Sequence, residues 1–228
     1  ILSIDSSIST FVLVPVPMFI LMGTVIFHSG IAYRMIDVLD EWLGRIAGRL
    51  ALLAIGAGSL FGTLTGVAMG SVAMLGSTLV PDMERRGYSK SMSIGPILAS
   101  GSLAIMIPPS ALGVILASMG QFSVGKLLIG ILLPGLLLAV VYATYVVIRC
   151  HIQPHLAPAY EVVPTPIGPR IMRTLQYVLP LVIIIGIVIG TIFAGVATPT
   201  EAAALGALFC FLLVACYGKL TWQVIKKS

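Results

Sequence analysis

Long apolar runs dominate this sequence and constrain its fold more than any other feature. Only 9% of the 228 residues are charged, and the mean hydropathy is +1.11. A soluble domain carries about 25% charged residues, so most of this chain must be solvated by lipid. The runs lie approximately at 9–30, 50–81, 92–119, 127–148, 175–195 and 201–217. The sequence therefore predicts an all-α polytopic membrane protein.

The basic residues lie in short segments between these runs, as is typical of juxtamembrane loops. If the first run enters from outside, the segments at 31–49, 82–90, 149–173 and 218–228 face the cytoplasm. They hold all 13 lysine and arginine residues except Lys126. This distribution satisfies the positive-inside rule. We expect no nucleic-acid partner, although the net charge is +5.

The run at 50–81 has cytoplasmic flanks on both sides, so it must enter and leave the membrane on the same side. Two full crossings need about 40 residues and one crossing about 20, and the run fits neither. Two limbs of about 14 residues reach roughly 20 Å, somewhat past the middle of the bilayer. The sequence predicts a re-entrant hairpin with its tip near residues 62–70. One long tilted span is the alternative. It would place residues 82–90 outside, and their basic residues would then break the positive-inside pattern.

Residues 33–48, before the hairpin, have the pattern of an amphipathic helix. Ile36, Leu39, Leu43 and Ile46 recur at spacings of 3, 4 and 3. Such a helix can lie in the membrane interface as an arm that links two moving parts. A short cytoplasmic connector is the alternative interpretation.

The run at 92–119 contains adjacent prolines near its centre, Pro108 and Pro109. Each lacks a backbone donor, and together they disfavour helix at Ile107. With Ser110 beside them, they favour a real helix break over a simple kink. The hairpin tip and the break then both offer helix ends, carbonyls and hydroxyls inside the membrane. No charged side chain or histidine lies at the centre of a predicted span, so oxygen coordination of a monovalent cation is favoured over a proton relay.

Several motifs resemble the large, DctM-like membrane subunit of tripartite ATP-independent periplasmic (TRAP) transporters. They are "PMFILMG" (17–23), "MLGSTLVPDMERRGYSK" (74–90), "GPILASGSLAIMIPPSALG" (95–113), "LLPGLLLA" (132–139) and "GVATPTEAAALGAL" (195–208). The resemblance covers nearly the whole chain. It implies a secondary transporter of the ion-transporter superfamily, with inverted repeats, a scaffold and a moving elevator domain driven by Na⁺. It also implies a multi-pass protein of the bacterial inner membrane, with a small membrane subunit and a periplasmic substrate-binding protein as partners.

The sequence departs from the family pattern at the hairpin tip. Family members often carry a "SGSS"-like tip, whereas this chain reads "TGVA", with Val67 and Ala68 in place of hydroxyls. Ser71 is the nearest replacement. The resemblance also leads us to expect an incomplete permease, because a second hairpin, a second broken helix and an earlier span are missing. Within the chain, the expected parts are a scaffold span with an arm helix (1–49), the transport unit of hairpin and broken helix (50–119), a transmembrane helix (120–150), a cytoplasmic loop (151–174) and two scaffold spans that begin the second repeat (175–228).

The predicted function is Na⁺-coupled import of organic anions such as carboxylates, delivered by the binding protein, with no cofactor other than the coupling ion. The candidate substrate and ion residues are Thr65, Gly66 and Ser71 at the tip, and Gly101, Ser102, Pro108, Pro109 and Ser110 on the broken helix. Na⁺ itself is assigned to Thr65, Gly66 and Ser110.

Three alternatives come from other classes of function. A superfamily carrier without a binding protein is the nearest, and a channel would need a continuous polar pore lining. An intramembrane enzyme would need polar catalytic side chains inside the bilayer, and the sequence shows none with suitable chemistry.

A few residues have a structural interpretation that competes with a functional one. Glu201 completes a predicted capping box with Thr198 as N-cap and Pro199 at the first helical position. His28 is expected to fill space at the membrane interface. The three cysteines have no metal-ligand spacing and are expected to be small packing residues.

Overall fold

The computed structural model describes residues 13–44, 46–158 and 166–228, and this part of the chain is helical and contains no strand. The helices are α2 (Pro15–His28), α3 (Ile31–Trp42), α4 (Arg49–Thr65), α5 (Ala68–Arg85), α6 (Lys90–Met106), α7 (Ala111–Met119), α8 (Val124–Ile152), the short 3₁₀ helix η2 (Pro154–Leu156), α9 (Ile167–Tyr177), α10 (Leu179–Phe193), α11 (Pro199–Cys216) and α12 (Trp222–Lys227). The predicted all-α class is confirmed.

Length and composition support membrane insertion. Three helical stretches of the described chain are long and apolar enough to cross a bilayer: Val124–Ile152, Ile167–Phe193 and Pro199–Cys216. Two bent pairs pass the same test jointly: α2 with α3, bent by 73°, and α6 with α7, bent by 48°. The chain is therefore a polytopic membrane protein.

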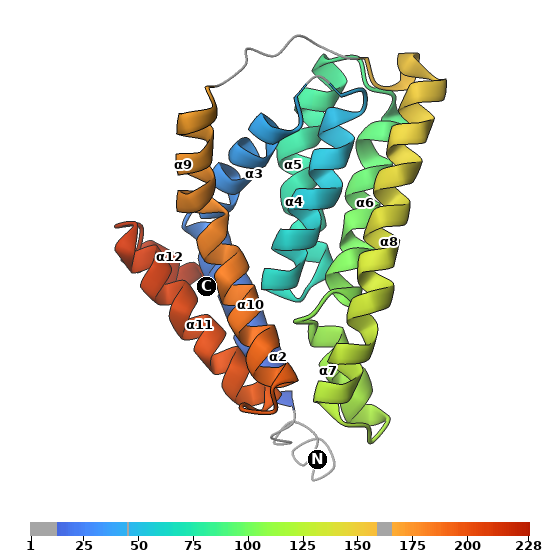
Figure 1. Cartoon of the computed structure of the whole chain (residues 1–228). Helices are drawn as coiled ribbons and strands as arrows, with labels where there is room; N and C mark the ends of the chain where they lie inside the picture. The colour runs from blue at the N-terminus through green and yellow to red at the C-terminus, as the bar shows by residue number, and fades with distance from the viewer. Residues whose placement is uncertain (1–12, 45, 159–165) are drawn as a thin grey trace.

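The helices form two groups that meet along α2 and α4 (Figure 1). In one group, α4 and α5 run antiparallel and both pack on α6, which also packs on α8. In the other, α11 lies between α2 and α10 in contact with both. The arm helix α3 crosses between the groups and contacts α9 (Figure 1).

Small residues allow the closest helix approaches in the first group. A Cβ on Gly58 of α4 would lie 2.4 Å from the Cβ of Ser100 in α6. One turn further on, a Cβ on Gly62 would lie 2.4 Å from the Cβ of Ala104. Within lipid, helices associate through such small-residue contacts because no hydrophobic driving force holds them together.

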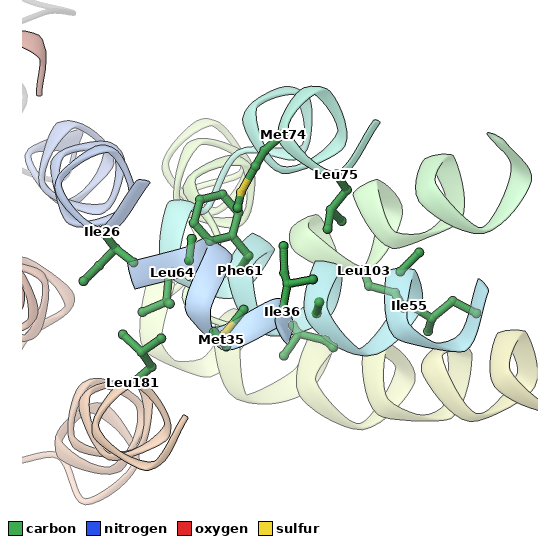
Figure 2. Packing of buried hydrophobic residues seen from close by; sticks show 14 of the residues in the cluster. Ile26, Met35, Ile36, Ile55, Phe61, Leu64, Met74, Leu75, Leu103 and Leu181 are labelled. Atoms are coloured by element: carbon green, nitrogen blue, oxygen red, sulfur yellow. The ribbon is translucent and has the colours of Figure 1, made fainter. Parts of the chain in front are cut away.

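Apolar side chains from both groups share one core. Figure 2 shows Phe61 and Leu64 of α4 near Met74 of α5, with Ile26 of α2 and Leu181 of α10 on the other side. All five side chains are almost completely buried. The hairpin is therefore packed against neighbours on several sides, and its position is determined by those contacts.

The arm helix is shorter than predicted. It begins at Ile31 and ends at Trp42, whereas the apolar spacing predicted a helix over 33–48. Gly44, directly after the C-cap Leu43, has a φ angle of +56°, a left-handed conformation that ends the helix, and Gly48, with φ +76°, is already the N-cap of α4. Ile46 is consequently 46% exposed and takes no part in the buried stripe.

The range 151–174 was predicted as a cytoplasmic loop, and its described part is partly helical. α8 continues to Ile152, η2 follows, and α9 begins at Ile167. Only Val178 separates α9 from α10, so the two form one continuous apolar stretch. Residues 159–165 of the predicted loop, and the start of the predicted first span at 9–12, lie outside the described residues.

Candidate functional site

The hairpin tip consists of two residues, Gly66 and Val67, between α4 and α5. Gly66 has a φ of +61°, and its N–H donates to the Gly62 carbonyl at 2.8 Å, which closes the last turn of α4. Val67 is extended, with φ −130° and ψ 119°. The predicted hairpin, with its tip at 62–70, is confirmed as a backbone geometry.

Thr65 stabilises this turn from its last helical position. Its hydroxyl lies 3.2 Å from the Gly62 carbonyl and 3.1 Å from the Val67 carbonyl, and it accepts the Val67 N–H at 3.3 Å. Thr65 is only 7% exposed. The tip is therefore held by a buried hydroxyl that contacts backbone groups on both sides of Gly66.

The predicted helix break is confirmed in place of a kink. α6 ends at Met106, Ile107 is extended, and α7 begins at Ala111. Because Pro108 and Pro109 have no N–H, the carbonyls of Ala104 and Ile105 cannot receive the usual helical hydrogen bond. Ser110 is completely buried and caps α7, since its hydroxyl accepts the Gly113 N–H at 3.1 Å.

The tip and the break are in direct contact. The Ala111 N–H donates to the Gly66 carbonyl at 3.3 Å. A Cβ on Gly66 would lie 3.1 Å from the Ala111 nitrogen, so only glycine fits here without a shift. The contact between the hairpin tip and the helix break therefore includes the three residues predicted to bind Na⁺: Thr65, Gly66 and Ser110.

The other predicted site residues lie farther along the helices. Ser71 is completely buried in α5, where its hydroxyl donates to the Ala68 carbonyl at 2.9 Å. A Cβ on Gly101 would lie 2.6 Å from the Val72 side chain, so this glycine allows α6 to approach α5. The Ser102 hydroxyl donates to the Ala99 carbonyl and is 3.2 Å from the Tyr142 hydroxyl of α8. Ser102 therefore faces α8.

Two glycines of the site were missed by sequence reasoning. A Cβ on Gly23 of α2 would lie 2.4 Å from the Cα of Thr65. A Cβ on Gly135 of α8 would lie 2.8 Å from the carbonyl oxygen of Met106, at the start of the break. Both lie in motifs quoted above, "PMFILMG" and "LLPGLLLA", but one sequence does not show which neighbour a helical glycine faces.

A cavity of about 430 Å³ lies beside the tip, between α2 and the hairpin. Thr65 and Gly70 line it from the hairpin, and Thr24 and His28 line it from α2. The Nδ1 of His28 is 2.9 Å from the Thr24 carbonyl within its own helix. The cavity gives the tip an opening on the α2 side.

The site contains no charged side chain from the described residues, and the same part of the chain holds no group of three His, Cys, Asp or Glu residues that could bind a metal. Of the three cysteines, Cys150 and Cys210 are buried and Cys216 is exposed, and all are free. The predicted capping box is confirmed: Glu201 accepts the Thr198 N–H at 2.7 Å, and its own N–H donates to the Thr198 hydroxyl. Because the described site has no charged side chain, any recognition there rests on backbone dipoles and hydroxyls.

Fold and site together define a multi-pass membrane protein in which a helical hairpin meets an interrupted helix within the bundle. A family model, "Tripartite ATP-independent periplasmic transporter, DctM component", matches residues 2–228. The chain belongs to this family and is a protein of the bacterial inner membrane.

Curated relatives agree with this assignment. The C4-dicarboxylate TRAP transporter large permease protein DctM of Pseudomonas aeruginosa is 33% identical over 87% of this chain and 45% of its own length. The ectoine TRAP transporter large permease protein TeaC of Halomonas elongata is 35% identical over 88% of this chain and 46% of its own. The isethionate TRAP transporter permease protein DctMQ of Oleidesulfovibrio alaskensis is 32% identical over 93% of this chain and 33% of its own. The chain spans half or less of the length of these three relatives.

Proposed function

We propose that this chain forms part of the large membrane subunit of a Na⁺-coupled importer of small organic anions. The observation that carries the proposal is the hydrogen bond from the Ala111 N–H to the Gly66 carbonyl, which joins the hairpin tip to the helix break. Interrupted helices that meet inside a membrane bundle are the usual place for substrate and ion sites in secondary transporters. The family assignment supports the same function.

The substrate side of the site is formed by helix N-termini. α5 begins at Ala68 without a side-chain cap, so its first N–H groups are open to a ligand. α7 begins at Ala111, directly beside the tip, and contributes its helix dipole, since its Ala111 and Gly113 N–H groups already donate to the Gly66 carbonyl and the Ser110 hydroxyl. Helix N-termini attract anions through their free N–H groups and the positive end of the helix dipole. The substrate class is therefore a carboxylate or a similar small anion, in line with relatives named for C4-dicarboxylates and isethionate.

The ion side is formed by oxygens. The carbonyls of Ala104 and Ile105, freed by the prolines, and the hydroxyls of Thr65 and Ser110 are neutral hard ligands. With no carboxylate in the described site, the ligand set suits a monovalent cation. Val67 and Ala68 supply only backbone groups to such an ion.

The mechanism that we propose is elevator-like movement. The moving unit comprises α4 to α7, and α2, α10 and α11 belong to the scaffold. α3 lies between them and leaves α2 at a bend of 73°. A small membrane subunit and a periplasmic binding protein complete the transporter.

The test is uptake by the full-length permease that contains this chain, reconstituted with its two partner proteins. Uptake should require both a Na⁺ gradient and the binding protein. Na⁺-independent uptake would contradict the coupling. Uptake without the binding protein would instead support a superfamily carrier that works alone.

Ser110→Ala tests the ion site directly. A hydrogen-bonding contact to a charged group contributes about 1.5–3 kcal/mol, so the Na⁺ concentration for half-maximal uptake should rise about tenfold or more. Ser110→Thr keeps a hydroxyl and a helix cap and should restore most of the affinity. Ser59→Ala is the matched control, because Ser59 donates to the Ile55 carbonyl inside α4 at 2.6 Å. An unchanged Na⁺ dependence in a folded Ser110→Ala variant would remove this side chain from the site.

A further inference from the structure

A second cavity lies between α6 and α8. Its volume is about 500 Å³, within the usual range of small-molecule pockets. Ile55 of α4 and Val146 of α8 contribute to its lining, and both side chains are buried. None of the residues that carry the proposed transport function lines this cavity.

The cavity is a groove along α6 and α8, and it exists because α6 has small residues, Gly95 and Ala99, where they line it. A Cβ on Gly95 would meet nothing within 4 Å, and Gly95 is exposed toward the cavity with Ala99 one turn further on. Toward the helix break, the two helices close up again, since Ser102 contacts Tyr142 and Gly135 lies against Met106. The groove therefore has one closed end, at the break, and one end near the start of α6.

The end of the groove near the start of α6 is positive. Arg149, in the last turn of α8, lines the cavity there, and its side chain is exposed and forms no ion pair with a described residue. Ser91, in the first turn of α6, lies at the same end, where the positive end of the α6 dipole is offset by the negative end of the α8 dipole, so Arg149 supplies the net positive charge. No acidic residue lines the cavity. An anionic group is the complementary ligand.

A polar acceptor also lies at this end. Pro96 has no N–H, so the carbonyl of Met92 cannot receive its usual helical hydrogen bond. Both residues line the cavity. Below them, the lining is apolar and aromatic, with Ala99, Val141 and Tyr145. The cavity thus combines a cationic end with an apolar trough along a membrane helix.

We propose that this groove binds one phospholipid with an anionic headgroup, such as phosphatidylglycerol. The phosphate lies on Arg149 and Ser91, a headgroup hydroxyl donates to the Met92 carbonyl, and an acyl chain occupies the trough beside Gly95. The basic segments of the sequence predict that this end of α8 faces the cytoplasm, so the lipid comes from the cytoplasmic leaflet. A permanent lipid here would fill the space between α6 and α8 while the interrupted helix moves.

The test is native mass spectrometry of the full-length permease after exchange into phosphatidylglycerol or phosphatidylcholine micelles. Wild-type protein should retain phosphatidylglycerol over phosphatidylcholine. Arg149→Gln should retain about tenfold less, because it loses a charge-assisted contact to phosphate. Arg85→Gln is the matched control, since Arg85 is an exposed arginine that does not line the groove, and its retention should match the wild type.

A second pair of variants tests the trough. Gly95→Leu fills the groove and should lower phosphatidylglycerol retention as far as Arg149→Gln does. Gly130→Leu adds the same side chain to α8 at a glycine with equally open space and should change nothing. Equal losses in Arg149→Gln and Arg85→Gln would overturn the proposal, because they would show a general charge effect. So would displacement by inorganic phosphate at the same concentration as the lipid, or a wild-type protein that retains no phosphatidylglycerol.

Discussion

Two contacts of the hairpin–arm region use opposite chemistry. Where the hairpin tip meets the helix break, Thr65, Gly66 and Ala111 interact through backbone groups and one hydroxyl. Where the arm helix α3 meets α9, charged and aromatic side chains form the contact. Arg173 pairs with Glu41 at 2.5 Å, and the Trp42 indole N–H donates to the Thr174 hydroxyl at 2.8 Å.

The difference follows from the surroundings of each contact. At the tip, Thr65 and Ser110 are buried, so an unpaired charge beside them would be very costly and backbone groups must find partners. At α3 and α9, the Arg173 side chain is 54% exposed, so water lowers the desolvation cost of its ion pair with the 15% exposed Glu41, and the pair contributes little. Close packing should therefore dominate the stability of the first contact, and small electrostatic terms that of the second.

The largest effect is expected from Gly23→Ala, which disturbs the tip. The added Cβ would lie 2.4 Å from the Cα of Thr65, a backbone atom that cannot move without shifting the hairpin. Overpacking usually costs about 1–3 kcal/mol and more where backbone must shift, so the melting temperature in detergent should fall steeply. Gly56→Ala is the control, because its added Cβ meets nothing and removes glycine's backbone freedom, which should stabilise by about 0.5–1 kcal/mol. Equal melting temperatures for the two variants would contradict the close approach.

The next effect in size is expected from Arg49→Met, at the corner between arm and hairpin. Arg49 is 3% exposed and donates to both carboxylate oxygens of Asp40, at 2.7 and 2.6 Å, and to the Gly44 carbonyl at 3.0 Å. Removing one partner of a buried pair costs about 3–5 kcal/mol. Because the Asp40 side chain is 31% exposed, water compensates part of this loss, and we expect about 2 kcal/mol. Arg85→Met, at an arginine that is 81% exposed, should change the melting temperature little.

A smaller effect is expected from Arg173→Gln, in the second contact. The Arg173 side chain is 54% exposed and its partner Glu41 is 15% exposed, so the pair is half-buried and should contribute about 1 kcal/mol, the upper end of the range for exposed pairs. The loss should shrink further at high salt, because salt screens exposed charges. A double-mutant cycle with Glu41→Gln, measured by thermal unfolding at low and high salt, isolates the pair. A coupling as large as the Arg49 effect would show that the two contacts do not differ as proposed.

The sequence predicted the hairpin and the helix break better than it predicted how the two contact each other. Loop charge and run length located the hairpin, and Pro108 and Pro109 located the break, because both arguments depend on local sequence. Which residues Gly23 and Gly135 contact depends on how helices far apart in the sequence pack. A single sequence does not show this. The predicted arm helix was too long at its C-terminal end because the apolar spacing continued to Ile46, whereas Gly44 adopts a left-handed conformation that ends the helix.

The smallest effect is expected from pH, through Asp37 on the arm. Burial raises the pKa of this carboxyl, opposed by the charge of Arg34 and reinforced by Asp40 and Glu41. A raised pKa in the folded state means that the folded chain binds more protons than the unfolded one, so stability is greatest below the ordinary pKa and falls as pH rises through the raised value.

Asp37→Asn should therefore flatten the melting temperature between about pH 4 and 7 without lowering it at neutral pH. The change should be confined to the contact of α3 with α9, because the tip holds no titratable group from the described chain. If the variant instead loses stability at neutral pH, Asp37 acts mainly as a partner of Arg34 or Arg173, and electrostatic attraction outweighs burial at this contact. Hydrogen exchange at α3 and at the tip, compared across the same pH range, would show whether the two contacts open separately.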